Sequence, residues 1–197
     1  MIISDKHKYI FISNPKTGTH TMYHYLPKLY DGERYGGFHE RQLPKNHKEY
    51  FVFTTIRDPF ERLVAAWNSL LFQPDYRPIY IEKVGSDSFG DFVRWILEFD
   101  NQTKFHGRGS PVITLQSVWL KDVLDHIDHF VVTNDMNNSF AKLPFSTGTD
   151  VFEAKLKRNH SEFKNLAQEL TGDEYDKLCE WLKPDINLYH HACLDNE

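Results

Sequence analysis

The segment NPKTGTHT, residues 14–21, gathers residue types that bind anions. It contains one lysine, Lys16, one glycine, Gly18, and three threonines. A glycine lets the backbone approach a ligand closely, and backbone N–H groups at the start of a helix attract negative charge. With the hydroxyls and the lysine, these groups predict a cradle for a phosphate or a similar anion. The alternative is that Pro15 and Gly18 only turn the chain and that Lys16 is a solvated surface residue.

A second charged segment, TIRDPFERLVAAW, occupies residues 55–67. Arg57 directly follows an apolar run, and its guanidinium presents a planar fork of donors that suits a phosphate. It could instead pair with Asp58 or with another carboxylate. Arg62 lies one helical turn further on and either joins the same site or pairs with Asp58. Pro59 is well placed for the first turn of a helix.

Each segment lies between a predicted strand and a predicted helix. Apolar runs rich in β-branched and aromatic residues predict strands at 8–13, 50–56 and 129–133. Helical patterns follow at 19–30 and from Pro59 onward. This alternation predicts an α/β fold with a parallel sheet flanked by helices, in which ligands bind at the carboxyl ends of the strands. Both segments should therefore lie at the same edge of the sheet.

The rest of the chain continues this pattern within one predicted domain, residues 1–197. Asn134 or Asp135 could cap a helix after the third strand, and an amphipathic helix is expected near residues 89–99. Two helical stretches follow from residue 161, with breaks near Gly172 and at Pro184.

Composition excludes several classes of protein. The chain has 197 residues, with 23 Lys plus Arg against 28 Asp plus Glu, so its net charge is −5. An acidic chain without a long basic run is not expected to bind nucleic acid. Cys179 and Cys193 are too few for a disulfide framework and are expected to be free thiols. No apolar stretch is long enough to span a membrane, so we expect a soluble, intracellular and cytoplasmic protein without a membrane partner.

Taken together, NPKTGT after one strand and RDPFERLV after the next resemble the sulfotransferases, in particular the carbohydrate-type, family 2-like group. The resemblance is specific over about residues 8–67. It implies a fold similar to P-loop nucleotide kinases, with 3′-phosphoadenosine 5′-phosphosulfate (PAPS) as sulfuryl donor and no metal. The acceptor would be a hydroxyl, by analogy that of a carbohydrate. Family members include Golgi enzymes, from which this chain differs in its small size and in having no apparent anchor.

The resemblance also implies roles for individual residues. Lys16 would contact the 5′-phosphate and the bridging oxygen of the leaving group, and Arg57 would hold the 3′-phosphate. The remaining donors to the 5′-phosphosulfate would come from Thr17, Gly18, Thr19, His20 and Thr21. For His20 the alternative is that it only caps its helix.

One position departs from the family pattern. Family members usually carry a serine eight residues after the arginine, as a second ligand to the 3′-phosphate, and this chain has Ala65. We therefore expect weaker PAPS binding or a substitute donor such as Asn68 or Ser69. Further along the chain, the basic stretch containing Lys155 and Arg158 either helps to close over PAPS or forms a solvated face.

Sulfuryl transfer also needs a base for the acceptor proton. His39 lies between the two segments, where related carbohydrate-type enzymes often have a histidine, and it is the candidate base. Glu40 is the alternative. The histidine pairs at residues 126 and 129 and at 190 and 191 lack a third partner at metal-binding spacing, so no metal is predicted.

Two other functions remain open from the sequence. A P-loop-like kinase would share the strand, loop and helix order. Its Walker loop, however, needs a lysine after the second glycine, whereas Lys16 precedes Gly18. A protein that binds PAPS or its product without turnover is favoured only by Ala65.

Overall fold

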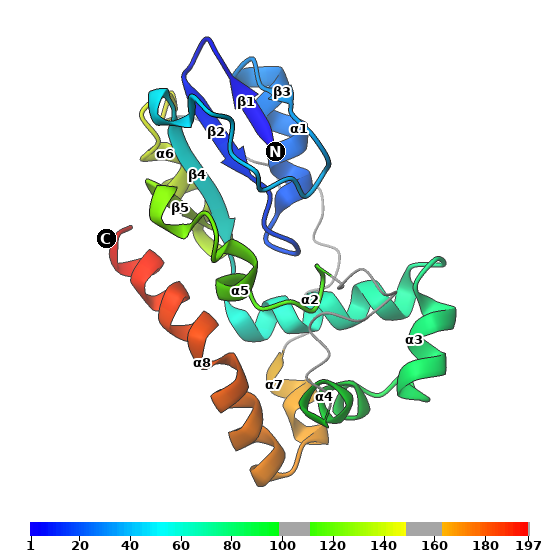
Figure 1. Ribbon diagram of the computed structural model, residues 1–197. Helices are drawn as coiled ribbons and strands as arrows, with labels where there is room; N and C mark the ends of the chain where they lie inside the picture. The colour runs from blue at the N-terminus through cyan, green and yellow to red at the C-terminus, as the bar shows by residue number, and fades with distance from the viewer. Residues whose placement is uncertain (99–110, 149–162, 197) are drawn as a thin grey trace. The chain divides into compact units, whose positions relative to one another are not determined.

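A computed structural model describes residues 1–98, 111–148 and 163–196 (Figure 1). The chain divides into two compact units. The first comprises residues 1–58, 116–156 and 188–197, and the second comprises residues 59–115 and 157–187. The single domain expected over residues 1–197 stays a prediction. The basic stretch containing Lys155 and Arg158 lies outside the described residues.

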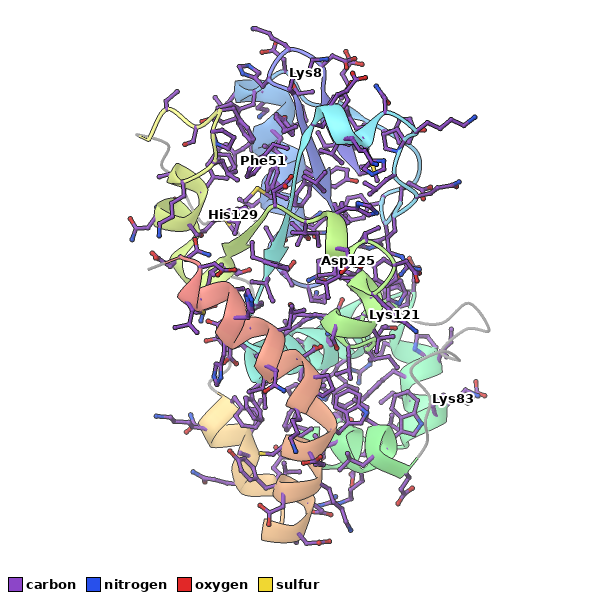
Figure 2. All side chains as sticks on the ribbon, turned by 60° about the vertical axis from the view of Figure 1, so that its left-hand side comes forward. Lys8, Phe51, Lys83, Lys121, Asp125 and His129 are labelled. Atoms are coloured by element: carbon purple, nitrogen blue, oxygen red, sulfur yellow. The ribbon has the colours of Figure 1, made fainter. Side chains whose placement is uncertain are left out.

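The first unit is built on a five-stranded sheet with the order β3-β1-β2-β4-β5. Its strands are β1 (Ile2–Ser4), β2 (Tyr9–Ile12), β3 (Glu33–Arg34), β4 (Phe51–Ile56) and β5 (His129–Val132). Figure 2 labels Phe51 and His129, the residues with which β4 and β5 begin. β2, β4 and β5 are parallel, as predicted. The prediction of a wholly parallel sheet is wrong, because β1, which was not predicted, pairs antiparallel with β2 and β3. The four residues between β1 and β2 are too few for a parallel crossover.

Helices of the first unit cover both faces of this sheet. Tyr9 and Phe11 of β2 pack with α1 (Thr19–Leu29) and α6 (Met136–Ala141). Ile10 and Ile12 point to the opposite face, where α5 (Gln116–Leu120) and the end of α8 (Gly172–Leu194) contribute Leu120 and Ala192. Successive residues of a strand point to opposite faces, so the all-apolar β2 fits a sheet buried on both sides. Asp135 stands at the predicted N-cap position of α6.

The second unit is helical. It contains α2 (Pro59–Phe72), α3 (Arg77–Val84), α4 (Phe89–Glu98), α7 (Phe163–Leu166) and α8 up to residue 187. Its core is apolar and rich in aromatic residues, among them Trp67, Tyr80, Phe89, Phe92 and Trp95. Short 3-10 helices elsewhere in the described chain lie at His47–Glu49, Leu124–His126, Thr133–Asp135 and Ala167–Glu169.

The predicted break at Pro184 is wrong, because α8 continues through it. A proline inside a helix removes one backbone hydrogen bond and costs about 3 kcal/mol. Leu178 and Leu182 of the same helix are buried in the core of the second unit, and Ala192 is buried in that of the first. Burying an aliphatic side chain contributes about 1.5–3 kcal/mol, so this packing offsets the cost of the proline.

A charged network on the surface of the second unit joins α4 to the start of α8. Arg94 Nε lies 2.6 Å from Glu174 Oε1, and Arg94 Nη1 lies 2.6 Å from Asp91 Oδ1. Glu174 Oε2 also accepts a hydrogen bond from the backbone N–H of Thr171, at 2.7 Å. The hydrogen bond from Arg94, followed by the one from Thr171, lowers the pKa of Glu174 to about 2.

Candidate anion site of the first unit

The carboxyl ends of β2, β4 and β5 lie at one edge of the sheet because these strands are parallel (Figure 1). Polar residues follow each strand: Asn14 comes after β2, Arg57 after β4 and Thr133 after β5. The hydroxyl of Thr133 lies 2.8 Å from the carbonyl oxygens of both Thr17 and Ile56. The structure thus brings the two predicted segments together within the first unit, with Thr133 between them.

Buried hydroxyl groups hold the first segment in shape. Thr17 Oγ1 donates to the carbonyl oxygen of Asn14 at 2.7 Å and lies 2.6 Å from Thr55 Oγ1. Thr19 Oγ1 donates to the same carbonyl at 2.6 Å. Both threonines are buried. Their hydroxyl hydrogens are therefore used inside the protein, and what these two residues can offer to an anion is their backbone N–H groups.

The backbone of this segment is left-handed at two residues. Gly18 has a φ of 88° and Lys16 has a φ of 66°. A Cβ atom on Gly18 would lie 2.7 Å from the terminal methyl carbon of Met136, a flexible group that would have to shift, so the left-handed backbone is the main reason for a glycine here. A lysine in this region is strained by about 1–2 kcal/mol, and such strain is concentrated at functional sites. The chain places Lys16 between β2 and α1 despite this cost.

The start of α1 supplies N–H groups. Gly18 is its N-cap, and the Gly18 carbonyl oxygen accepts hydrogen bonds from Thr21 at 2.9 Å and Met22 at 3.3 Å. The preceding N–H groups of the first turn, those of Thr19 and His20, have no carbonyl within the helix to bond. No acidic residue occupies this turn. Burial, and then the charge of Lys16, lower the pKa of His20. The neutral form of His20 is thereby favoured next to Lys16.

Arg57 is held by a residue that sequence reasoning missed. The side-chain amide of Gln116, the first residue of α5, donates from Nε2 to the Arg57 carbonyl oxygen at 2.9 Å. Its Oε1 accepts from the Arg57 N–H at 3.1 Å and from Asn14 Nδ2 at 3.3 Å. Gln116 is fully buried. A single glutamine 59 residues after Arg57 belongs to no motif, so only the fold could reveal it.

His39 lies beside the end of β2. Its Nδ1 is 2.9 Å from the hydroxyl of the buried Ser13, and its ring contacts those of Phe38 and Trp119 edge-on. Burial is the main cause that lowers the pKa of His39 from 6.5 to about 4. At neutral pH the imidazole is therefore uncharged and able to accept a proton.

Glu40, the alternative base, is engaged by its own turn. Its Oε1 accepts hydrogen bonds from the backbone N–H groups of Arg41 and Gln42, each at 2.9 Å. These bonds, that of Gln42 first, lower the pKa of Glu40. The Glu40 carboxylate is thus held within its own turn, and the choice of His39 over Glu40 as the base stays a prediction.

Other residues considered from the sequence lie in the second unit. Arg62 is buried, and its guanidinium donates to the carbonyl oxygens of Thr114 at 2.8 Å and Pro111 at 3.4 Å. Ala65, Asn68 and Ser69 are buried in α2. Whether one of them replaces the missing serine stays a prediction. Within the described residues, no three His, Cys, Asp or Glu side chains are grouped as metal ligands, and both cysteines are free.

Comparisons with known proteins found relatives that share one name. Carbohydrate sulfotransferase 10 from Homo sapiens is 26% identical over 132 residues, which cover 49% of this chain and 37% of that protein. The proteins of the same name from Gallus gallus and Rattus norvegicus are 28% and 29% identical, with the same coverage. The chain thus spans little more than a third of the length of these relatives. No solved structure matches it.

The cytoplasmic location expected from the sequence is wrong. That expectation set the chain apart from the Golgi enzymes of the carbohydrate-type group. The chain is nevertheless similar to Carbohydrate sulfotransferase 10, a carbohydrate-type enzyme. Small size carries no weight, since only part of each relative is matched. Among the described helices, none has both the length and the apolar character needed to cross a membrane.

The match to a family rests on the region that contains the site. The model of the sulfotransferase family matches residues 1–118. This range includes the Lys16 segment, His39, Arg57 and Gln116, and it exceeds half of the chain. The chain belongs to the sulfotransferase family.

Proposed function

We propose that this protein transfers a sulfuryl group from PAPS to the hydroxyl of a carbohydrate. One observation carries the proposal: in a member of the sulfotransferase family, the Lys16 segment and Arg57 meet at one edge of the sheet. The relatives' name supports a carbohydrate acceptor.

The donor set at this edge fits an anionic nucleotide. Lys16, the N–H groups at the start of α1 and Arg57 provide positive charge and hydrogen-bond donors, and the first turn of α1 has no acidic residue. We assign the 5′-phosphosulfate to Lys16, the backbone N–H groups of residues 17–20 and Thr21. Arg57 is assigned the 3′-phosphate. When bound, PAPS supplies a sulfuryl group attached to a phosphate, which is a stable leaving group.

Lys16 and His39 have complementary roles in this proposal. The ammonium group of Lys16 stabilises the negative charge that develops on the oxygen leaving with the phosphate. His39 accepts the proton of the acceptor hydroxyl at Nε2, while Nδ1–H donates to Ser13 Oγ and fixes the tautomer. Its pKa of about 4 describes the free protein, and anionic phosphates nearby would raise it and so strengthen the base.

The test is transfer of a labelled sulfuryl group. The protein would be incubated with ³⁵S-labelled PAPS and a panel of oligosaccharides, and labelled product and released 3′,5′-ADP would be measured together. Lys16→Ala should lower the rate of transfer by about 10²–10³-fold. Lys28→Ala, which removes an exposed lysine at the other end of α1, should leave the rate unchanged. Absence of both products with every acceptor, together with no binding of 3′,5′-ADP, would contradict the proposal.

A further inference from the structure

We infer that Gln116 is the positioning residue that fixes Arg57, and that it thereby sets the preference of the site for nucleotides with a 3′-phosphate. The inference rests on the proposed function, because it assigns the 3′-phosphate to Arg57. It concerns a side chain that lies outside both sequence motifs. Gln116 itself is not expected to touch the nucleotide.

The side-chain amide of Gln116 forms hydrogen bonds with both backbone polar groups of Arg57. Nε2 donates to the carbonyl oxygen at 2.9 Å, and Oε1 accepts from the N–H at 3.1 Å. Together the two bonds fix the peptide groups on both sides of the Arg57 Cα. They act where β4 has ended and the sheet no longer orients the chain. The direction in which the Arg57 side chain leaves the backbone therefore depends on Gln116.

The same amide also contacts the first segment. Oε1 accepts from Asn14 Nδ2 at 3.3 Å, and Asn14 Nδ2 also donates to the Thr55 carbonyl oxygen at 3.0 Å. Asn14 and Gln116 are both fully buried. A buried network in which each bond restrains the next allows little independent movement of its members. Gln116 thus couples the position of Arg57 to that of the segment carrying Lys16.

The helix that carries Gln116 has anchors of its own. Trp119 Nε1 donates to the Ser13 carbonyl oxygen at 3.1 Å, and Arg41 Nη1 donates to the Trp119 carbonyl oxygen at 2.6 Å. Leu120 is fully buried under the sheet. Lys121 and Asp125, labelled in Figure 2, follow on the segment that leads to β5. Because these contacts remain when only the amide is changed, α5 should stay in place in a Gln116 variant.

The experiment compares two nucleotides that differ only in the 3′-phosphate. Calorimetric Kd values for 3′,5′-ADP and 5′-AMP would be measured for the wild type and for Gln116→Met, which keeps the size of the side chain but removes the hydrogen bonds. Misplacing one charged ligand should weaken 3′,5′-ADP binding by about 10-fold or more. The Kd for 5′-AMP should change much less, because Asn14 Nδ2 keeps its bond to the Thr55 carbonyl oxygen. In turnover, KM for PAPS should rise while kcat is retained.

A second substitution and a control keep the outcome clear. Gln116→Asn keeps the amide but shortens the side chain by one methylene group, so it cannot reach both backbone groups of Arg57, and its loss of affinity for 3′,5′-ADP should fall between the wild type and Gln116→Met. If Gln116→Met does not fold, this second variant still tests whether Gln116 sets the preference for nucleotides with a 3′-phosphate. Gln73→Met, at an exposed glutamine of the second unit, should leave both Kd values unchanged.

The possible failures are distinct. A wild type without preference for 3′,5′-ADP would refute the proposed function. A wild type that prefers 3′,5′-ADP, with folded Gln116 variants that keep the preference, would overturn the role of Gln116 alone. Equal weakening of both nucleotides would also overturn it, since that is the result expected of a merely structural residue.

Discussion

The two units of the chain differ in how much of their buried interior is polar and in where the buried polar side chains lie. In the first unit, polar residues are buried beside the carboxyl ends of the strands: Ser13, Asn14, Thr17, Thr19, Thr54, Thr55 and Gln116. In the second unit, aromatic and aliphatic side chains form most of the core, the buried polar side chains among its described residues are Arg62, Asn68, Ser69 and Asp185, and the charged network of Arg94 lies at the surface. The first unit therefore contains groups whose geometry depends on hydrogen bonds, and the second depends mainly on apolar packing.

Because of this difference, substitutions that impair function and substitutions that only lower stability should fall in different parts of the chain. A buried polar group is costly unless its partners are correctly placed, so a hydrogen-bonded network favours one arrangement of its backbone. Apolar packing is less directional and mainly sets the free energy of unfolding. Changes at the strand ends of the first unit should impair nucleotide binding or turnover, whereas changes in the aromatic core of the second unit should alter stability alone.

The largest effect is expected at His39. Removal of a general base costs about 10²–10⁴-fold in rate, so His39→Ala should lower kcat by that factor while 3′,5′-ADP still binds. Ser13→Ala, which keeps the imidazole but removes the partner of Nδ1, should cause a smaller fall. Steady-state kinetics of both variants measure the difference. His24→Ala, at an exposed histidine of α1, is the control. An unchanged kcat in His39→Ala would remove His39 from the mechanism.

Each unit contains a glycine with a left-handed backbone, Gly18 in the first and Gly85 in the second. Gly18 and Gly85 have φ values of 88° and 78°, and a Cβ on Gly85 would meet no atom within 4 Å. Alanine at either position should lower the free energy of unfolding by about 1–2 kcal/mol because of the left-handed backbone. The near contact at Gly18 is with the flexible end of Met136, which can move.

The two alanine variants should differ in function. Gly18→Ala should lose affinity for 3′,5′-ADP, since the backbone at the start of α1 changes. Gly85→Ala, in the second unit, should retain it. Urea unfolding and calorimetry together test the pair, and equal loss of affinity in both variants would contradict the separation.

Acid should destabilise the first unit at a higher pH than the second. Burial lowers the pKa of His39 from 6.5 to about 4, so between these values the unfolded chain binds a proton that the folded unit does not. Stability should therefore fall as the pH decreases from 6.5 to about 4. Urea titrations followed residue by residue by NMR would measure this window. His39→Ala should reduce the slope, and an undiminished slope would assign the window to other groups.

Glu174 gives the corresponding test in the second unit, with a smaller effect. Its pKa is lowered from 4.5 to about 2, so its contribution is present above pH 4.5 and is lost as the pH falls toward 2. Glu174→Gln should reduce that loss and cost about 0.2–1 kcal/mol at neutral pH, as expected for an exposed ion pair. The wild type is the reference, in which the loss of stability between pH 4.5 and about 2 should be larger than in Glu174→Gln. The same NMR titrations measure both losses.

Sequence patterns predicted the elements whose signals are long. The apolar runs at 8–13, 50–56 and 129–133 became β2, β4 and β5, and the order of strand, segment and helix placed Arg57 and the Lys16 segment at one edge. β1 and β3 were missed because strands of three and two residues leave almost no periodicity, and both residues of β3 are exposed. The break at Pro184 failed because packing along α8 outweighs the local cost of proline.

The site was predictable only where residues belong to a motif. Lys16 and Arg57 stand next to predicted strands, so their meeting follows from a parallel sheet. Gln116 makes two hydrogen bonds to Arg57, 59 positions away, and Ser13 makes one to His39, 26 positions away, and neither residue type signals such a role. The left-handed backbone of Lys16 was equally hidden, because lysine rarely adopts it.

The most direct test of the central claim is calorimetric titration of the wild type and Arg57→Ala with 3′,5′-ADP, and in parallel with 5′-ADP plus Mg²⁺. It requires no knowledge of the acceptor. We predict metal-independent binding of 3′,5′-ADP by the wild type, and a Kd about 10–100-fold higher in Arg57→Ala, as expected for loss of a charged hydrogen bond. Preference for 5′-ADP with Mg²⁺, or an unchanged Kd in Arg57→Ala, would contradict a sulfotransferase site at this edge of the sheet.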